Sequence, residues 1–148
     1  MIQRKQSIFL LMVLIIAMIQ FFLPFQTLIS SEKTWFVCLL PGCSSDVIGT
    51  IIYVPMIFNL LIVILTVVTI FIYKNRVFQY KLANLSVLFN LFMIGFFFLL
   101  SFANDGFVGS VNYQFGAFLP AFSAIFAFFA AHFIKKDELL VRSADRIR

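Results

Sequence analysis

The chain has 148 residues, of which 63% are hydrophobic and 11% charged, and 22 are phenylalanine. This composition excludes an ordinary soluble domain. The net charge is +5, but the basic residues stand at the ends of apolar runs, which favours contact with lipid headgroups over nucleic-acid binding.

The first apolar run covers residues 7–28 and follows a basic start with Arg4 and Lys5. A basic start before an apolar run is also typical of a signal peptide. This run is longer than the apolar core of a signal peptide, and no Ala-x-Ala-like cleavage site follows it. We therefore expect it to be kept as the first membrane span.

Residues 29–49 form the longest expected loop and contain the two cysteines, Cys38 and Cys43. The Pro41-Gly42 pair between them could turn the chain back far enough for a disulfide. A redox pair that exchanges disulfides is the functional alternative, but the spacing is not Cys-x-x-Cys and no base is nearby. The pattern favours a structural disulfide or two free thiols.

Residues 51–73 and 82–103 are apolar runs without a charged residue, and each exceeds the roughly 20 residues that a helix needs to cross a bilayer. The basic stretch between them predicts a transmembrane hairpin, whose polar residues are Lys74, Arg76, Gln79 and Lys81. Pro55 can kink the second span. Five amide side chains are expected to form hydrogen bonds between spans: Gln20, Gln26, Asn59, Asn84 and Asn90.

The fourth run covers residues 113–134, after a turn-rich loop. At helical spacing it has one face of phenylalanines and an opposite face of alanines that includes Ala117, Ala121 and Ala124. Small residues allow helices to approach closely in lipid, so one hypothesis is that the alanine face packs inside the bundle while the phenylalanine face meets lipid or a partner protein. The favoured alternative is that the pattern reflects lipid exposure alone.

The polar tail, residues 135–148, has the spacing of a short amphipathic helix. Its candidate contact residues are Lys135, Lys136, Asp137, Glu138, Arg142, Asp145 and Arg146. The tail could lie on the inner leaflet, dock on the cytoplasmic hairpin or bind another protein.

The distribution of cations predicts the orientation of the spans. Ten of the eleven Lys and Arg residues fall on the side of the chain ends and the hairpin, and only Lys33 falls on the other. The positive-inside rule then places both termini in the cytoplasm. The predicted fold is a single all-α integral membrane domain over residues 1–148, a four-transmembrane-helix bundle with a short amphipathic cytoplasmic helix at its C-terminus.

The spans contain no Asp, Glu, Lys or Arg, which weakens a pump or an ion-coupled transporter. His132 is the only histidine, and no cysteine or second histidine accompanies it to make a metal site. We expect no enzyme activity, no metal and no cofactor.

The cytoplasmic segments carry a resemblance. These are Met1–Gln6, Arg76–Gln79 with Lys81–Leu85, and the end segments Lys135–Leu139 and Val141–Arg146. Together they resemble a family of small four-span membrane proteins of Gram-negative bacteria, domain of unknown function 4293. The resemblance implies a bacterial inner-membrane location and brings no activity.

Three classes of function follow. The favoured one is a non-enzymatic accessory or scaffold subunit, which contacts other integral membrane proteins and lipid through its spans and tail. The second is a small oligomeric transporter or channel, although Phe-rich spans offer no obvious hydrophilic path. The third is a thiol-disulfide redox protein that uses Cys38 and Cys43.

Overall fold

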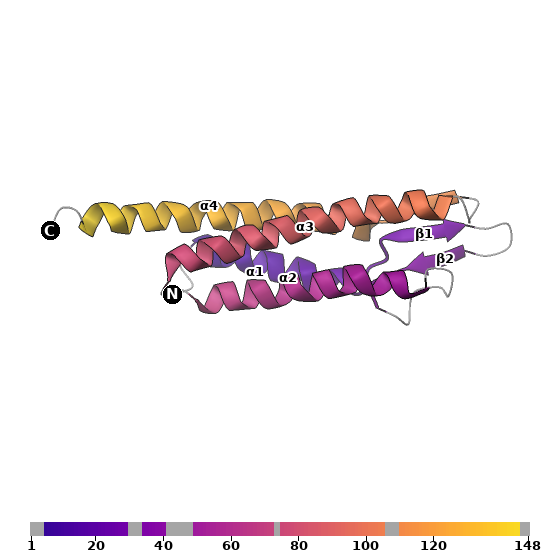
Figure 1. Ribbon diagram of the computed structural model, residues 1–148, viewed down its shortest axis with the longest axis horizontal. Helices are drawn as coiled ribbons and strands as arrows, with labels where there is room; N and C mark the ends of the chain where they lie inside the picture. The colour runs from indigo at the N-terminus through magenta and orange to yellow at the C-terminus, as the bar shows by residue number, and fades with distance from the viewer. Residues whose placement is uncertain (1–4, 30–33, 41–48, 73–74, 106–109, 146–148) are drawn as a thin grey trace.

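Four long helices make up most of the molecule. The computed structural model describes residues 5–29, 34–40, 49–72, 75–105 and 110–145. The helices are α1 (Lys5–Gln20), α2 (Tyr53–Phe71), α3 (Arg76–Asp105) and α4 (Leu119–Asp145), and short 3-10 turns, η1 (Gly49–Ile52) and η2 (Phe115–Phe118), precede α2 and α4. Both α1 and α3 contact α2 and α4, so the helices form a ring of neighbours along one long axis (Figure 1).

The surface of the bundle is apolar and its interior is partly polar. All four helices expose large apolar side chains, such as Leu11, Leu60, Leu88 and Phe128, whereas a dozen polar side chains among the described residues are buried. A soluble protein shows the reverse arrangement. In the part of the chain that the structure describes, three helical stretches are long and apolar enough to cross a membrane: Tyr53–Phe71, Arg76–Phe102 and Phe115–Val141. The length and the apolar surface of these helices indicate a helical bundle that associates with a membrane.

The first helix is shorter than the sequence predicts. The predicted span covers residues 7–28, but α1 ends at Gln20 and its apolar part is Gln6–Gln20. Pro24 explains the correction, because proline has no amide hydrogen to donate and disfavours helical geometry in the residue before it. The chain beyond it becomes a strand instead.

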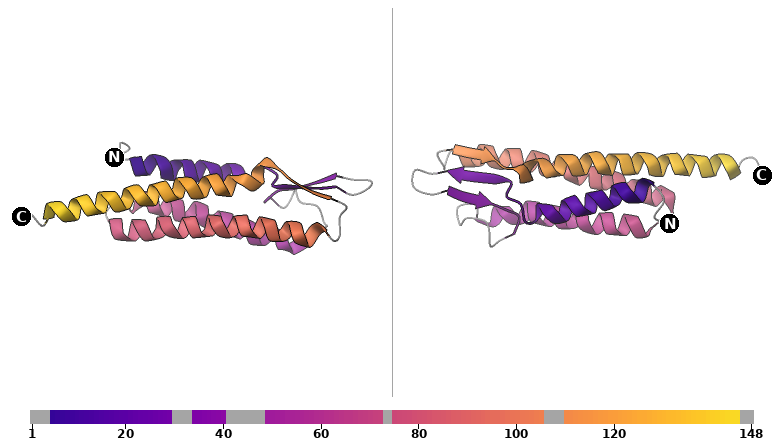
Figure 2. Two further views of the ribbon diagram at one scale, coloured as in Figure 1. Left: turned by 90° about the horizontal axis from the view of Figure 1, so that it is seen from above. Right: turned by 180° about the vertical axis from the view of Figure 1, so that it is seen from behind.

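A small antiparallel sheet closes the end of the bundle opposite the chain ends (Figure 2). It consists of β1 (Gln26–Ile29), β2 (Thr34–Val37) and β3 (Ser110–Tyr113), in the order β2-β1-β3. Gln26 pairs with Val37 on one side and with Tyr113 on the other. The sequence does not predict this sheet, because each strand has only four residues.

The remaining helix boundaries differ most at the charged end. The predicted third span begins at residue 82, but α3 begins at Arg76, where the side chain of Asn75 accepts a hydrogen bond from the Phe78 amide and caps the helix. The predicted fourth span ends at residue 134, but α4 continues to Asp145. No Gly or Pro interrupts residues 121–145, so the tail extends α4 and is not a separate short helix.

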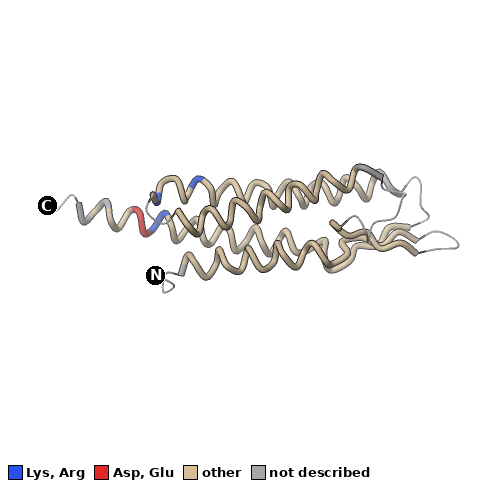
Figure 3. The backbone as a smooth tube through the Cα atoms, turned by 90° about the horizontal axis from the view of Figure 1, so that it is seen from below, with Lys and Arg blue, Asp and Glu red and all other residues tan. Residues whose placement is uncertain are grey.

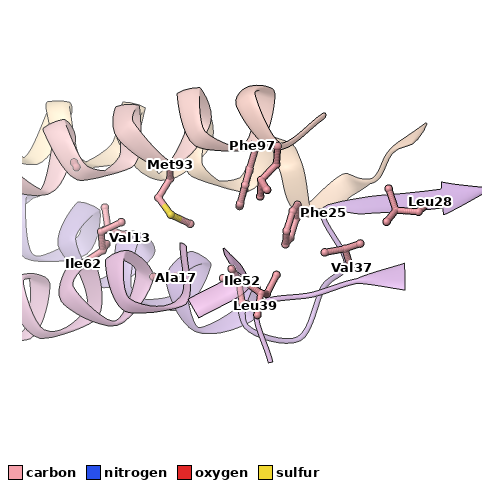
Figure 4. Close-up of a cluster of buried hydrophobic side chains, with 12 residues drawn as sticks. Val13, Ala17, Phe25, Leu28, Val37, Leu39, Ile52, Ile62, Met93 and Phe97 are labelled. Carbon is pink, nitrogen blue, oxygen red and sulfur yellow. The ribbon is translucent and has the colours of Figure 1, made fainter. Parts of the chain in front are cut away.

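One apolar core joins the bundle to the sheet. It includes Val13 and Ala17 of α1, Ile62 of α2, and Met93 and Phe97 of α3, and it continues into Phe25, Leu28, Val37, Leu39 and Ile52 (Figure 4). The sheet is therefore packed against the bundle as part of the same core.

Polar contacts hold the sheet to the helices as well. The Gln26 side chain donates hydrogen bonds to the Phe97 carbonyl, at 2.9 Å, and to the Ser101 hydroxyl. The Gln114 side chain donates to the Thr27 hydroxyl at 2.7 Å. The first three residues of β1 are buried, and β1 is the central strand, so neighbouring strands pair with it on both sides.

Candidate contact surface at the charged end of the bundle

The charged side chains that the structure describes all lie at the end of the bundle where α1 begins and α4 ends (Figure 3). They are Arg76 and Lys81 of α3, and Lys135, Lys136, Asp137 and Glu138 of α4. The predicted hairpin and the start of the predicted tail therefore meet in space. Lys74 of the hairpin lies outside the described residues.

A hydrogen bond joins the hairpin to α4. The Nη1 atom of Arg76 donates to the carbonyl oxygen of Asp137 at 2.8 Å. Gln79 turns inward, where it is buried and donates to the Thr69 carbonyl of α2 at 3.0 Å. Lys81 is exposed. Of the predicted hairpin residues, Arg76 and Gln79 thus connect helices, and Lys81 faces outward.

The aromatic residue Tyr80 also lies between α3 and α4 at this end of the bundle. The Lys135 Nζ atom lies 5.7 Å from the centre of the Tyr80 ring, within the range of a cation–π interaction. Tyr80 packs against the buried cluster of Ala83, Ala131 and Ile134, between α3 and α4. Tyr80 follows Arg76 by four residues, so both lie on one face of α3, and this spacing is a sequence signal for the contact.

The end of α4 projects beyond the other helices (Figures 1 and 2). We call residues 139–145, which follow the contact of Arg76 with Asp137, the projecting segment. Three consecutive apolar side chains in it are exposed: Leu139 (55%), Leu140 (60%) and Val141 (44%). Arg142 and Asp145 belong to this part of α4, and Arg146 lies outside the described residues. The segment thus presents apolar surface next to charged residues.

The alanines of α4 differ in burial. Ala124 is buried, and Ala117 and Ala121 are half-buried. The most deeply buried small residues of α4 are Ser123, Ala127, Ala130 and Ala131. The opposite face is not wholly lipid-exposed, because Phe9 of α1 lies 5.3–6.2 Å from the ring centres of Phe126, Phe129 and Phe133.

The five amide side chains expected to form hydrogen bonds between spans make different contacts in the structure. Asn59 donates to the Ala17 carbonyl of α1 at 3.0 Å, which confirms its predicted partner in a neighbouring helix. Gln26 bonds to α3, and Asn90 donates to the Ser86 carbonyl of its own helix. Gln20 is buried, and Asn84 is exposed. Buried polar groups thus connect neighbouring helices at several levels of the bundle.

The structure describes one of the two cysteines. Cys38 follows β2, is buried and is disulfide-bonded, whereas Cys43 lies outside the described residues. A buried sulfur is poorly placed to react with a partner, because disulfide exchange requires access to it. Within the described ranges, no group of three or more His, Cys, Asp or Glu could hold a metal ion.

Comparison with known proteins identifies a family. The family model described as "Domain of unknown function (DUF4293)" matches residues 2–147. No curated protein and no solved structure matches the chain.

Proposed function

The chain belongs to the DUF4293 family, and we propose that it is a non-enzymatic accessory or scaffold subunit of a bacterial inner-membrane protein complex. In this proposal the spans contact other integral membrane proteins, and the projecting segment binds a cytoplasmic part of one of them. A compact bundle that presents an exposed apolar segment suits a binding role.

The proposed orientation puts the charged end of the bundle in the cytoplasm. Cations are retained on the cytoplasmic side of bacterial membrane proteins, and this end carries Arg76, Lys81, Lys135 and Lys136. The sheet then faces the periplasm. Reporter fusions to the C-terminus test this orientation: a reporter active only in the cytoplasm is expected to work, and activity of a periplasmic reporter would contradict the proposal.

The observation that carries the binding role is the exposure of Leu139, Leu140 and Val141 on a helix that extends past its neighbours. These side chains follow the charged residues 135–138 of α4, so in the proposed orientation they meet water or another protein. Large apolar side chains that are exposed to water close to one another mark an interaction site. Its proposed occupant is an amphipathic cytoplasmic helix of an integral membrane protein, with an apolar stripe for the leucines and basic residues for Asp137 and Glu138.

Copurification from native membranes in mild detergent tests this role. The tagged chain is expected to retain a stoichiometric membrane-protein partner, and Leu139→Glu with Leu140→Glu is expected to release it. The bundle should stay equally stable, because both side chains are more than half exposed. Ser143→Glu is the matched control, since it adds a charge at an exposed position without removing apolar surface. A chain that purifies without any partner would overturn the proposal.

A transporter or channel is the second candidate, and the polar interior of the bundle favours it. Asn59, Asn90 and Ser123 are each at most 1% exposed, and they come from three different helices. Within the described part of the chain, the side-chain Oδ1 atoms of Asn59 and Asn90 and the Ser123 hydroxyl have no hydrogen-bond partner. The test is solute flux into liposomes that contain the purified chain alone. Flux that the Asn90→Leu variant abolishes would favour this candidate over the accessory role.

A further inference from the structure

A continuous exposed face of α4 changes from aromatic to basic near the charged end. Phe128 and Phe129 are exposed, and His132, Lys135 and Lys136 follow them, also exposed. Residues three and four positions apart are neighbours on a helix surface, so the three basic-type side chains lie together, one turn beyond the aromatic pair. In the sequence, the apolar run of α4 ends at Ile134, immediately before Lys135.

Two cationic side chains near this face, Lys135 and Arg76, contact other groups of the protein. Lys135 lies over the Tyr80 ring, and Arg76 donates one hydrogen bond to the Asp137 carbonyl. A guanidinium has five N–H donors, so most of the Arg76 donors remain for another acceptor. Within the described part of the chain, no ion pair joins Arg76 or Lys135 to a carboxylate. Their positive charge is therefore available to an anion.

We propose that Arg76 and Lys135, with His132 and Lys136 beside them, bind the phosphate of an anionic phospholipid whose acyl chains lie along Phe128 and Phe129. The site lies at the boundary between the apolar run and the polar end, which is the level of lipid headgroups. Basic pockets between membrane helices bind anionic headgroups in this way. The adjoining aromatic face favours a lipid over free phosphate, because free phosphate gains nothing from apolar surface.

Native mass spectrometry of the purified full-length chain tests the site. The chain is titrated with phosphatidylglycerol or with phosphatidylcholine of the same acyl chains, and the bound lipid is counted. Phosphatidylglycerol is expected to be retained preferentially. Lys135→Gln should weaken its binding about fivefold, since a basic residue near an anionic surface contributes about this much. Lys135→Arg should restore the binding.

Lys81→Gln is the matched control, because it removes the same charge from an exposed position of α3. It is expected to change phosphatidylglycerol binding less than twofold. Equal retention of the two lipids, or an equal loss in Lys81→Gln and Lys135→Gln, would overturn the proposal. Displacement of the lipid by inorganic phosphate at millimolar concentration would also overturn it, because it would show a site for the free anion. The experiment needs no partner protein, so its result is independent of the accessory role.

Discussion

Phe25 and Phe97 stack face to face, with ring centres 4.3 Å apart and ring planes within 8° of parallel. Phe25 precedes β1, and Phe97 is in α3, so the pair joins the sheet to the bundle. The neighbouring Gln26 donates a hydrogen bond to the carbonyl of the same Phe97. An aromatic contact and a polar contact at adjacent positions thus fix where the sheet sits.

Phe25→Ala should destabilise the protein by about 3–5 kcal/mol, because it removes a buried aromatic ring and leaves a cavity beside Phe97. The measurement is unfolding in detergent, followed by circular dichroism. Phe102→Ala is the control, since Phe102 is 78% exposed and its ring faces the surroundings of the bundle. Equal losses in the two variants would show that the stacked pair does not anchor the sheet.

Gly116→Ala should cost about 1–3 kcal/mol, because an added Cβ would lie 2.4 Å from the carbonyl oxygen of Pro24. The Gly116 amide donates to that same oxygen at 3.1 Å, so the two backbones cannot separate without losing a hydrogen bond. Gly95→Ala is the control, because its Cβ would meet nothing within 4 Å. It should be neutral or stabilising by up to about 1 kcal/mol, since alanine favours a helix. A neutral Gly116→Ala would refute the close approach.

Asn59→Leu should destabilise the bundle by about 0.6–1.7 kcal/mol, the range for hydrogen bonds between membrane helices. Its side-chain amide donates to the Ala17 carbonyl in the last turn of α1. The backbone amides of Phe21 and Phe22 donate to the Met18 and Ile19 carbonyls instead, so the Ala17 carbonyl accepts its hydrogen bond from Asn59. Asn84→Leu makes the same change at an exposed position and should shift stability by less than about 0.5 kcal/mol. If thermal unfolding gives both variants the same loss, the cap has no energetic role.

Ala127→Leu should destabilise by about 1–3 kcal/mol, because Ala127 is fully buried in the core and has no room for three more carbons. Ala121→Leu should cost less, since Ala121 is half-buried. Detergent stability of the two variants, measured side by side, checks the order. The reverse order would mean that α4 faces the bundle with a different side.

The sequence was sufficient for the helices because a membrane span requires a long apolar run, and such runs are visible without any tertiary information. It was sufficient also for the family, whose model matches residues 2–147. The helix ends were harder. At the charged end, α4 continues past the apolar run because helix propensity persists there, whereas hydropathy alone places the end at residue 134.

The amino-acid sequence by itself determined four helical segments, an apolar exterior and a clustering of cations near the chain ends, since each of these depends on local composition. Only the tertiary structure decided that residues 26–29 pair with residues 34–37 and 110–113, that Arg76 reaches Asp137, and that Tyr80 lies under Lys135. Two physical reasons apply. The contacts of β1 with β3, of Arg76 with Asp137 and of Tyr80 with Lys135 join residues far apart in the chain. The pairing of β1 with β2 is local, but strands of four residues have no periodic signal long enough to predict their partners.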